Sequence, residues 1–141
     1  TLGAPLASSE EILRALQITN ALDIVEQKKE GLDHMIMEGG VGFSGGQKQA
    51  LLLARLVLRN PNIVLLDEPT ASIDDVSEKI LIQHLKQWLG HRTLVVATHR
   101  PAVLQLVDRI IVIHEGKIIK DGPRDAILNP GNQPNAGGAS A

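Results

Sequence analysis

Phe-Ser-Gly-Gly-Gln-Lys-Gln occupies residues 43–49, and Ile-Val-Leu-Leu-Asp-Glu-Pro occupies residues 63–69, one helix length further on. These two stretches decide the fold. In the first, a serine followed three residues later by a glutamine forms a capping-box pattern, which predicts that a helix begins here. The two glycines between them allow another molecule to approach the backbone closely. Free amides at a helix start favour a phosphate, although an ordinary capped helix has the same pattern.

The second stretch predicts a buried strand that ends in two carboxylates. Four apolar residues, Ile63 to Leu66, precede Asp67 and Glu68. Open α/β sheets bind their ligands at the carboxyl ends of such strands. Because neighbouring residues of a strand point to opposite faces, we expect the two acids to have different roles.

Together with two later motifs, these stretches resemble the ATP-binding-cassette (ABC) ATPases. Residues 43–49 are similar to the signature motif of that family and residues 63–69 to its Walker B strand. Residues 72–75 are similar to its D-loop, and residues 98–100 to its switch histidine. The resemblance covers about residues 8–128. It implies an α/β fold, namely part of a P-loop NTPase (RecA-like) core with part of the helical subdomain of an ABC ATPase.

The resemblance also implies roles for individual residues and implies ATP and Mg²⁺ as cofactors. Asp67 would hold Mg²⁺ through water, Glu68 would polarise the attacking water, and His99 would contact the γ-phosphate. The signature residues would close over the nucleotide of a second, facing ATPase domain. The candidate nucleotide-binding residues are Ser44, Gly45, Gly46, Gln47 and Asp74.

The placement of His99 adds to what the resemblance implies. A lone histidine is usually structural or merely exposed. This one follows the predicted strand 93–97, at the same edge of the sheet as Glu68 if the two strands run parallel, and that placement, in the motif order of the family it resembles, favours a functional role. Its imidazole can donate a hydrogen bond to a phosphate or accept one from water, and the sequence does not fix the tautomer.

The sequence contains no phosphate-binding loop of the form G-x-x-x-x-G-K-[ST]. Gly116 and Lys117 are followed by Ile118 and lack the upstream glycine. The glutamine loop and the adenine-stacking aromatic of the family are also absent, so we expect a chain that lacks the Walker A half of the domain. Without that cradle, most contacts to the β- and γ-phosphates are lost. We therefore expect negligible ATP hydrolysis by the chain alone.

The remaining elements follow from capping signals, periodicity and breakers. Ser8 and Glu11 have the capping spacing of a helix start, and Ser72 with Asp75 has an approximate version of it. The helix predicted at residues 74–88 should bury Val76, Ile80, Leu81, Leu85 and Trp88. Predicted helices are a helix from Ser8, 21–27, the helix after the signature up to Asn60-Pro61, 102–107, 123–128 and 74–88. Predicted strands are 63–66, 93–97, 109–113 and 118–122, the last two forming a hairpin.

These elements suggest three segments. Residues 1–43 contain part of the helical subdomain and the lead-in to the signature, although a plain packing hairpin would account for the helices equally well. Residues 44–128 form the C-terminal part of the ATPase core. Residues 129–141 are rich in Asn, Pro, Gly, Ala and Ser, which predicts a disordered tail.

Composition excludes several classes of protein. A net charge of −2 with no long basic run gives no case for nucleic-acid binding, and the absence of cysteine excludes disulfides and cysteine metal sites. No apolar run approaches the roughly 20 residues needed to cross a bilayer. Any membrane role would come from another segment or subunit.

Within the family, the sequence is most similar to bacterial type I secretion (RTX protein) exporters. The similar phrases are Glu-Gly-Gly-Val-Gly before the signature and Val-Ala-Thr-His-Arg around the histidine. This implies a transmembrane domain as partner and a location at the cytoplasmic face of the bacterial inner membrane. The sequence departs from the family pattern at Phe43, Ala50 and Ile73. Ala50 replaces an arginine that is frequent there, which puts the contacts of that arginine in doubt.

Two other functions stay open. A soluble, non-transport ABC ATPase would have the same motifs, but residues 8–38 lack the sustained heptads of the chromosome and repair types. A non-enzymatic interaction fragment would explain the missing phosphate loop, but the signature, both acids and the histidine are intact. An isolated chain of this kind should expose an unpaired sheet edge and an apolar surface, so we expect self-association.

Overall fold

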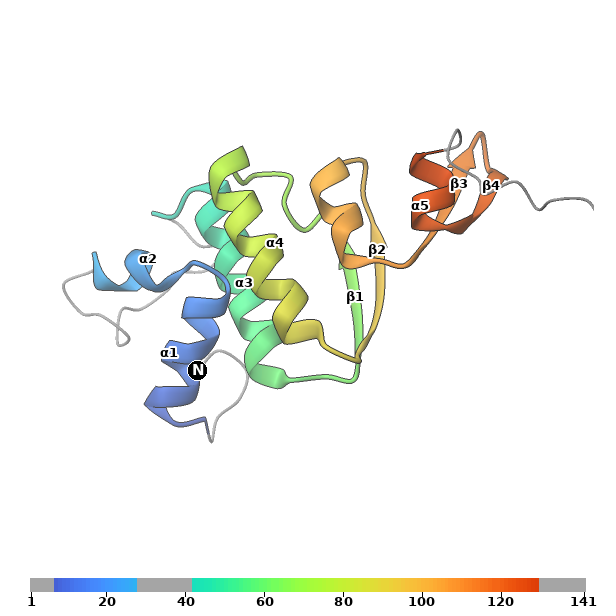
Figure 1. The fold of residues 1–141 in the computed structure, drawn as a ribbon. Coiled ribbons are helices and arrows are strands. Elements are labelled where there is room, and N and C mark those ends of the chain that lie inside the picture. The colour runs from blue at the N-terminus through green and yellow to red at the C-terminus, as the bar shows by residue number, and fades with distance from the viewer. Residues whose placement is uncertain (1–6, 28–41, 130–141) are drawn as a thin grey trace, which may run out of the picture. The chain divides into compact units, whose positions relative to one another are not determined.

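The computed structural model describes residues 7–27 and 42–129 (Figure 1). The chain divides into two compact units, Thr1–Leu106 and Val107–Ala141, and each is described by itself. The predicted tail lies outside the described residues from position 130 on, as does the part of the glycine-rich lead-in before Gly42. The division of the chain into three segments stays a prediction.

The first unit is a helical layer on a small parallel sheet, and it confirms the predicted α/β class. Helices α1, α3 and α4 lie side by side, and β1 and β2 follow beyond them in Figure 1. The elements are α1 (Ser9–Ile18), α2 (Leu22–Glu26), α3 (Gly45–Arg59), β1 (Ile63–Asp67), α4 (Asp75–Leu89), β2 (Thr93–Ala97) and the 3-10 helix η3 (Pro101–Leu106).

The core of this unit lies where α1, α3 and α4 meet. Leu16 of α1, Leu53 of α3 and Leu85 of α4 are buried in one cluster, and Leu66 of β1 packs against it. Small side chains such as Ala54 allow the helices to approach closely. Burial of these apolar surfaces is the main force that holds α1 against the other helices.

Predicted capping signals account for two of the helix starts. The hydroxyl of Ser8 accepts from the backbone N–H of Glu11, whose carboxylate accepts from the Ser8 N–H in return. Ser44 and Gln47 make the same reciprocal pair at α3. At the other end of α3, Asn60 adopts a left-handed conformation and Pro61 follows, so the helix stops where the sequence predicted.

The start and the buried face of α4 differ from the prediction. Asp74, not Ser72, caps the helix, since its Oδ1 accepts from the backbone N–H groups of Val76 and Ser77. Val76 is 71% exposed, and Ile80 is exposed as well, so both were wrongly predicted to be buried. The buried face of α4 consists of Glu78, Leu81, Ile82, Leu85 and Leu89.

A polar residue occupies the first turn of that buried face. Glu78 is buried and is paired with Arg100, a partner that lies far away in the sequence. A pattern based on apolar residues alone therefore identifies the wrong residues as buried in the first turns of α4. Trp88 is half-buried and packs against the core cluster, in line with its predicted packing role.

Strands β1 and β2 pair in parallel, with Leu65 opposite Val95. One face of the pair turns Val64 and Leu66 inward, where Val64 is fully buried. On the other face, Leu65 is 72% exposed and Val95 is 58% exposed. The sheet has two strands among the described residues, so the predicted unpaired edges and exposed apolar face are both present.

The second unit is a β-hairpin followed by a short helix. It consists of β3 (Arg109–His114), β4 (Lys117–Pro123) and α5 (Arg124–Leu128). Glu115 and Gly116 both have positive φ, as the tight hairpin turn requires. A side-chain pair between Arg109 and Asp121 bridges the two strands at 2.7–2.8 Å.

The strand predicted at residues 109–113 is apolar, and the isolated chain was expected to expose apolar surface. In the described part of the chain, β3 pairs with β4 and with no other strand. Ile111 and Ile113 are exposed on it. The second unit thus exposes apolar surface, as the sequence predicted for the isolated chain.

Candidate active site

The carboxyl ends of β1 and β2 bring Glu68, Thr98 and His99 together. The backbone N–H of Glu68 donates to the carbonyl of Ala97 at 2.9 Å and extends the parallel pairing by one residue. Glu68 itself has φ +42°, the left-handed region that non-glycine residues rarely adopt. This turn directs the Glu68 side chain back over the end of β2, a strained conformation of the kind found at functional sites.

The carboxylate of Glu68 is held by three donors. Its Oε2 accepts from the Thr98 hydroxyl at 3.2 Å, and its Oε1 accepts from the backbone N–H of His99 at 3.1 Å. Nδ1 of the His99 ring lies 2.7 Å from the same Oε1. The hydrogen bond with the His99 ring is the main reason why the pKa of Glu68 is lowered, with smaller contributions from Thr98 and the His99 backbone. The site therefore keeps Glu68 ionised.

Asp67 fits the predicted contact with Mg²⁺ but cannot make a metal site alone. Its carboxylate is exposed at the carboxyl end of β1. Residues 7–27 and 42–129 contain no group of three or more His, Cys, Asp or Glu side chains that could hold a metal ion. Mg²⁺ usually keeps several waters and takes one or two carboxylates together with substrate phosphates, so a single exposed acid suits such an ion.

The signature residues form the start of α3, as predicted. Ser44 caps the helix, and the backbone N–H groups of Gly45 and Gly46 make no hydrogen bond within the described residues. Such free amides, at the positive end of a 15-residue helix, fit an anionic phosphate.

Gly45 and Gly46 also pack closely against another segment of the same chain. A Cβ atom at Gly46 would lie 2.6 Å from the carbonyl oxygen of Ser72, and one at Gly45 would lie 3.2 Å from the Ser72 side chain. The close approach that was predicted for another molecule is thus already made by the D-loop segment (residues 72–75). A hollow of about 280 Å³ opens beside this contact, lined in part by Ser44, Gln47 and Asp74.

Asp74 has a local structural task. Its carboxylate caps α4, and the hydrogen bonds from Ser77 and Val76 lower its pKa. The structure places Asp74 beside the signature residues at the hollow, whereas Glu68 and His99 form a separate cluster at the strand ends. A direct contact of Asp74 with nucleotide stays a prediction.

Sequence analysis missed Gln49, which connects the two clusters. Its Nε2 donates to the backbone carbonyl of Glu68 at 2.7 Å, and its Oε1 accepts from the backbone N–H of Ser72 at 3.1 Å. The available signal was its spacing, because Gln49 lies one helical turn beyond the signature glycines and faces the same side as Gly45 and Gly46.

Arg100 is the second residue that was missed. Its Nε lies 2.7 Å from Oε1 of Glu78, and its Nη2 reaches both Glu78 and Asp75 at 2.9 and 3.0 Å. The pair with Glu78 is the main reason why the pKa of Arg100 is raised. Since Arg100 directly follows His99, this pair ties the switch-histidine segment to α4.

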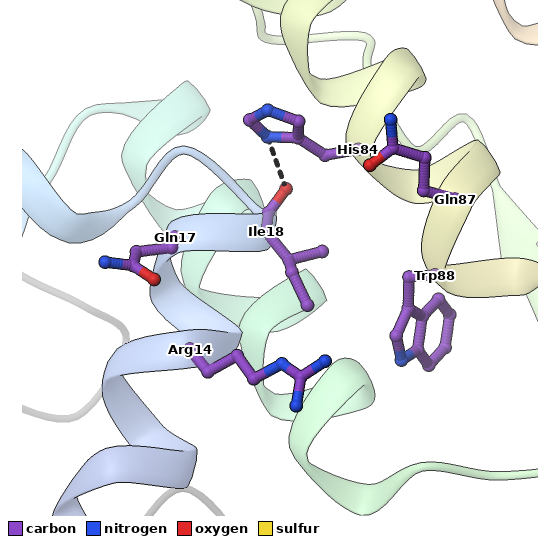
Figure 2. Close-up of a pocket in the computed structure, with 6 residues that line it drawn as sticks. All are labelled: Arg14, Gln17, Ile18, His84, Gln87 and Trp88. Atoms are coloured by element: carbon purple, nitrogen blue, oxygen red, sulfur yellow. Dashed lines mark hydrogen bonds between the residues drawn. The ribbon is translucent and has the colours of Figure 1, made fainter.

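A second hollow lies between α1 and α4 and contains none of the predicted site residues. It measures about 300 Å³ and is lined by Arg14, Gln17, Ile18, His84, Gln87 and Trp88 (Figure 2). Nδ1 of His84 lies 3.2 Å from the carbonyl oxygen of Ile18, the last residue of α1. The Arg92 guanidinium lies 4.7 Å from the centroid of the Trp88 ring. These contacts tie α4 to the end of α1 and to the turn that follows α4.

Comparison with known proteins identifies the family of this chain. The family model described as ABC transporter matches residues 7–71, the range that includes the signature, Asp67 and Glu68. The ATP-dependent lipid A-core flippase of Chromobacterium violaceum is 38% identical over 125 residues. The chain belongs to the ABC transporter family. Its predicted resemblance to ABC ATPases is therefore confirmed.

Two further comparisons show how much of each relative the chain covers. The alpha-hemolysin translocation ATP-binding protein HlyB of Escherichia coli O157:H7 is 34% identical over 129 residues, which are 92% of this chain and 18% of that protein. The flippase alignment covers 89% of this chain and 21% of the flippase. A solved structure of a bacterial Atm1-family ABC exporter with ATP bound has a TM-score of 0.83 and 28% identity, over 92% of this chain and 23% of the exporter chain.

The chain thus spans about a fifth of the length of these ABC transporter relatives. The segments that it matches belong to ABC transporters, and the one with a solved structure is an exporter. None of the helices among the described residues has the length and apolar character required to span a membrane.

Proposed function

We propose that these residues supply the signature, the Walker B acids and the switch histidine of an ATPase domain that drives export by an ABC transporter. The observation that supports this most strongly is the pairing of Glu68 with His99 at the ends of two adjacent parallel strands. Asp67 stands beside the pair, at the position suited to Mg²⁺. In this proposal the complete domain binds ATP and Mg²⁺.

Glu68 would act on the attacking water. Its lowered pKa keeps the carboxylate ionised at neutral pH, so it can accept a hydrogen bond from water and orient it. Because an ionised carboxylate can only accept, the His99 Nδ1 carries the hydrogen that it shares with Glu68. The His99 side chain is 81% exposed, which leaves the ring accessible to a γ-phosphate. Mg²⁺, when bound, would neutralise charge on the phosphates.

The signature residues would act on a second ATPase domain. The free amides of Gly45 and Gly46 and the hydroxyl of Ser44 lie at one helix start and suit a phosphate that another subunit presents. The described residues contain no phosphate-binding loop that could present a nucleotide to the start of α3. A site shared with a second domain would explain why the signature and the Walker B motif occur together in this chain. Partners of the complete protein would then be a second ATPase domain and a transmembrane domain.

The test is Glu68→Gln in the complete ATPase that contains these residues. We expect ATP hydrolysis to fall at least 100-fold, in line with the loss of a general base, while ATP affinity stays within twofold. Glu26→Gln, at the exposed end of α2, serves as the matched control and should leave both values unchanged. Undiminished hydrolysis by the Glu68→Gln protein would remove Glu68 from this role.

We further propose that the 141-residue chain alone does not hydrolyse ATP. The sequence contains no G-x-x-x-x-G-K-[ST] loop, and such a loop supplies most contacts to the β- and γ-phosphates. ATPase activity should appear only after mixing with a segment that carries that loop. Activity of the chain alone would contradict the proposal, and activity in neither sample would favour the alternative of a non-enzymatic interaction fragment.

We propose type I protein secretion across the bacterial inner membrane as the transport process, with the ATPase at the cytoplasmic face. Similarity to a hemolysin translocation protein supports this, whereas the flippase supports export of a lipid and a soluble non-transport ABC ATPase remains the alternative. Reconstitution of the complete transporter in vesicles separates these possibilities. A polypeptide substrate should stimulate its ATPase activity in type I secretion, and a lipid substrate should do so in lipid export. A non-transport ATPase should respond to neither.

A further inference from the structure

The side chain of Gln49 makes one hydrogen bond to each of two functional segments. It donates from Nε2 to the carbonyl oxygen of Glu68 at 2.7 Å. It accepts at Oε1 from the backbone N–H of Ser72 at 3.1 Å. Gln49 is half-buried on α3, one turn after the signature glycines. A single residue of the signature helix is therefore bonded both to the Walker B glutamate and to the D-loop segment.

The bond to Glu68 falls at the point that sets the direction of its carboxylate. Glu68 has φ +42°, a conformation that residues with a side chain rarely adopt. Its backbone N–H is held by Ala97 on one side and its backbone carbonyl by Gln49 on the other. These two bonds stabilise the peptide planes on both sides of the strained residue.

The same helix touches the D-loop segment a second time. The backbone of Gly46 packs so closely against the Ser72 carbonyl that a Cβ atom would lie 2.6 Å from it. Ser72 is thus fixed to α3 by this packing and by the bond from its N–H to Gln49. A movement of α3 relative to β1 must then either carry Ser72 and the Glu68 carbonyl with it or break these contacts.

We propose that Gln49 is a positioning residue that couples the signature helix to the Glu68 carboxylate and to the D-loop segment. The coupling rests on the proposed function, because it matters only if Glu68 acts on the attacking water. When a phosphate binds at the start of α3 and shifts the helix, the hydrogen bond from Gln49 moves the backbone carbonyl of Glu68 with it. The signature helix thus controls how Glu68 is held, in addition to any contact with nucleotide.

Glutamine is suited to this task because its amide donates and accepts at once. Glutamate has nearly the same shape and keeps the acceptor for Ser72, but its ionised carboxylate cannot donate to the Glu68 carbonyl and repels it. Methionine has similar length and makes neither bond. Gln49→Glu and Gln49→Met therefore separate the bond to Glu68 from the bond to Ser72.

The experiment measures hydrolysis and binding separately in the complete ATPase. We expect both variants to lower kcat about tenfold or more, with KM and ATP affinity within twofold of the parent. The matched controls are Gln83→Glu and Gln83→Met, at an exposed glutamine of α4, and both should behave as the parent. Glu68→Gln is measured in parallel.

The outcomes distinguish this inference from the proposed function. If Glu68→Gln abolishes hydrolysis while both Gln49 variants keep the parent kcat, the positioning role is refuted and the proposed function stands. If Glu68→Gln keeps full activity, the proposed function itself fails. A Gln49 variant that loses ATP affinity with kcat unchanged would show a merely structural role and also overturn the inference.

Discussion

Nδ1 of His99 lies 2.7 Å from Oε1 of Glu68, the shortest of the contacts that hold this carboxylate. The ring is therefore expected to control how Glu68 titrates. His99→Ala removes the ring but keeps the backbone N–H, so the pKa of Glu68 should rise toward its ordinary value. NMR titration of the Glu68 carboxyl carbon measures this change. His91→Ala, at an exposed position before β2, is the control and should leave the pKa unchanged.

The lowered pKa of Glu68 also makes stability depend on pH. A carboxyl group with a pKa below its unfolded value stabilises the fold above the unfolded pKa, and this contribution is lost as the pH falls through the folded pKa. The parent chain should thus lose more stability between neutral and acidic pH than His99→Ala does. Urea unfolding at a series of pH values tests this, and equal losses in the two proteins would contradict it.

Gly46→Ala should destabilise the first unit because the added Cβ atom meets the Ser72 carbonyl at 2.6 Å. Backbone cannot rotate away as a side chain can, so the free energy of unfolding should fall on the order of 1–3 kcal/mol, as for other overpacked sites. Urea unfolding provides the measurement.

Gly45→Ala is the matched control for that change. Its Cβ atom would lie 3.2 Å from Cβ and Oγ of Ser72, a milder contact that a shift of a few tenths of an ångström relieves, and alanine is about 1 kcal/mol more favourable than glycine within a helix. We therefore expect little net loss of stability. If Gly45→Ala proves the more damaging of the two, the close packing of Gly46 on the D-loop segment is not what requires glycine there.

Local signals in the sequence predicted much of this structure. The capping pairs Ser8–Glu11 and Ser44–Gln47 form as predicted, because each partner lies within four residues of the other. The strand before Asp67 was predicted as well, since a short apolar run between breakers indicates a strand. The motif order then indicated that Glu68 and His99 share one edge of a parallel sheet.

Contacts across long stretches of sequence were not predictable in the same way. The burial of Glu78 depends on Arg100, 22 residues away, and periodicity of apolar residues cannot register a buried acid. The bond from Gln49 to the Glu68 carbonyl spans 19 residues and involves a backbone atom, which no side-chain pattern reveals. The identity of the α4 cap was also missed, because Ser72 and Asp74 both have side chains that can cap.

The ion pair between Arg100 and Glu78 should be necessary for stability because Glu78 is buried. Removal of one member leaves the other charge without its partner in the protein interior, which destabilises more than removal of both. Glu78→Met and Arg100→Met should each lower the thermal unfolding temperature, and the double variant should lose less than the sum of the two. Additive losses would show that the two side chains do not interact. Arg109→Met is a control at an exposed pair and should change the temperature little.

The exposed face of β1 and β2 should cause the isolated chain to self-associate. Leu65 and Val95 lie opposite each other on that face, and both strands have an unpaired edge within the described residues. Apolar surface of this kind is buried favourably against a second copy. Sedimentation velocity should show that the average mass of the chain rises with concentration. Leu65→Lys with Val95→Lys should shift the chain toward monomer, whereas Leu52→Lys, at an exposed leucine of α3, should not. A compact monomer at all concentrations for the parent chain would refute this prediction, and equal effects of the two replacements would place the contact elsewhere.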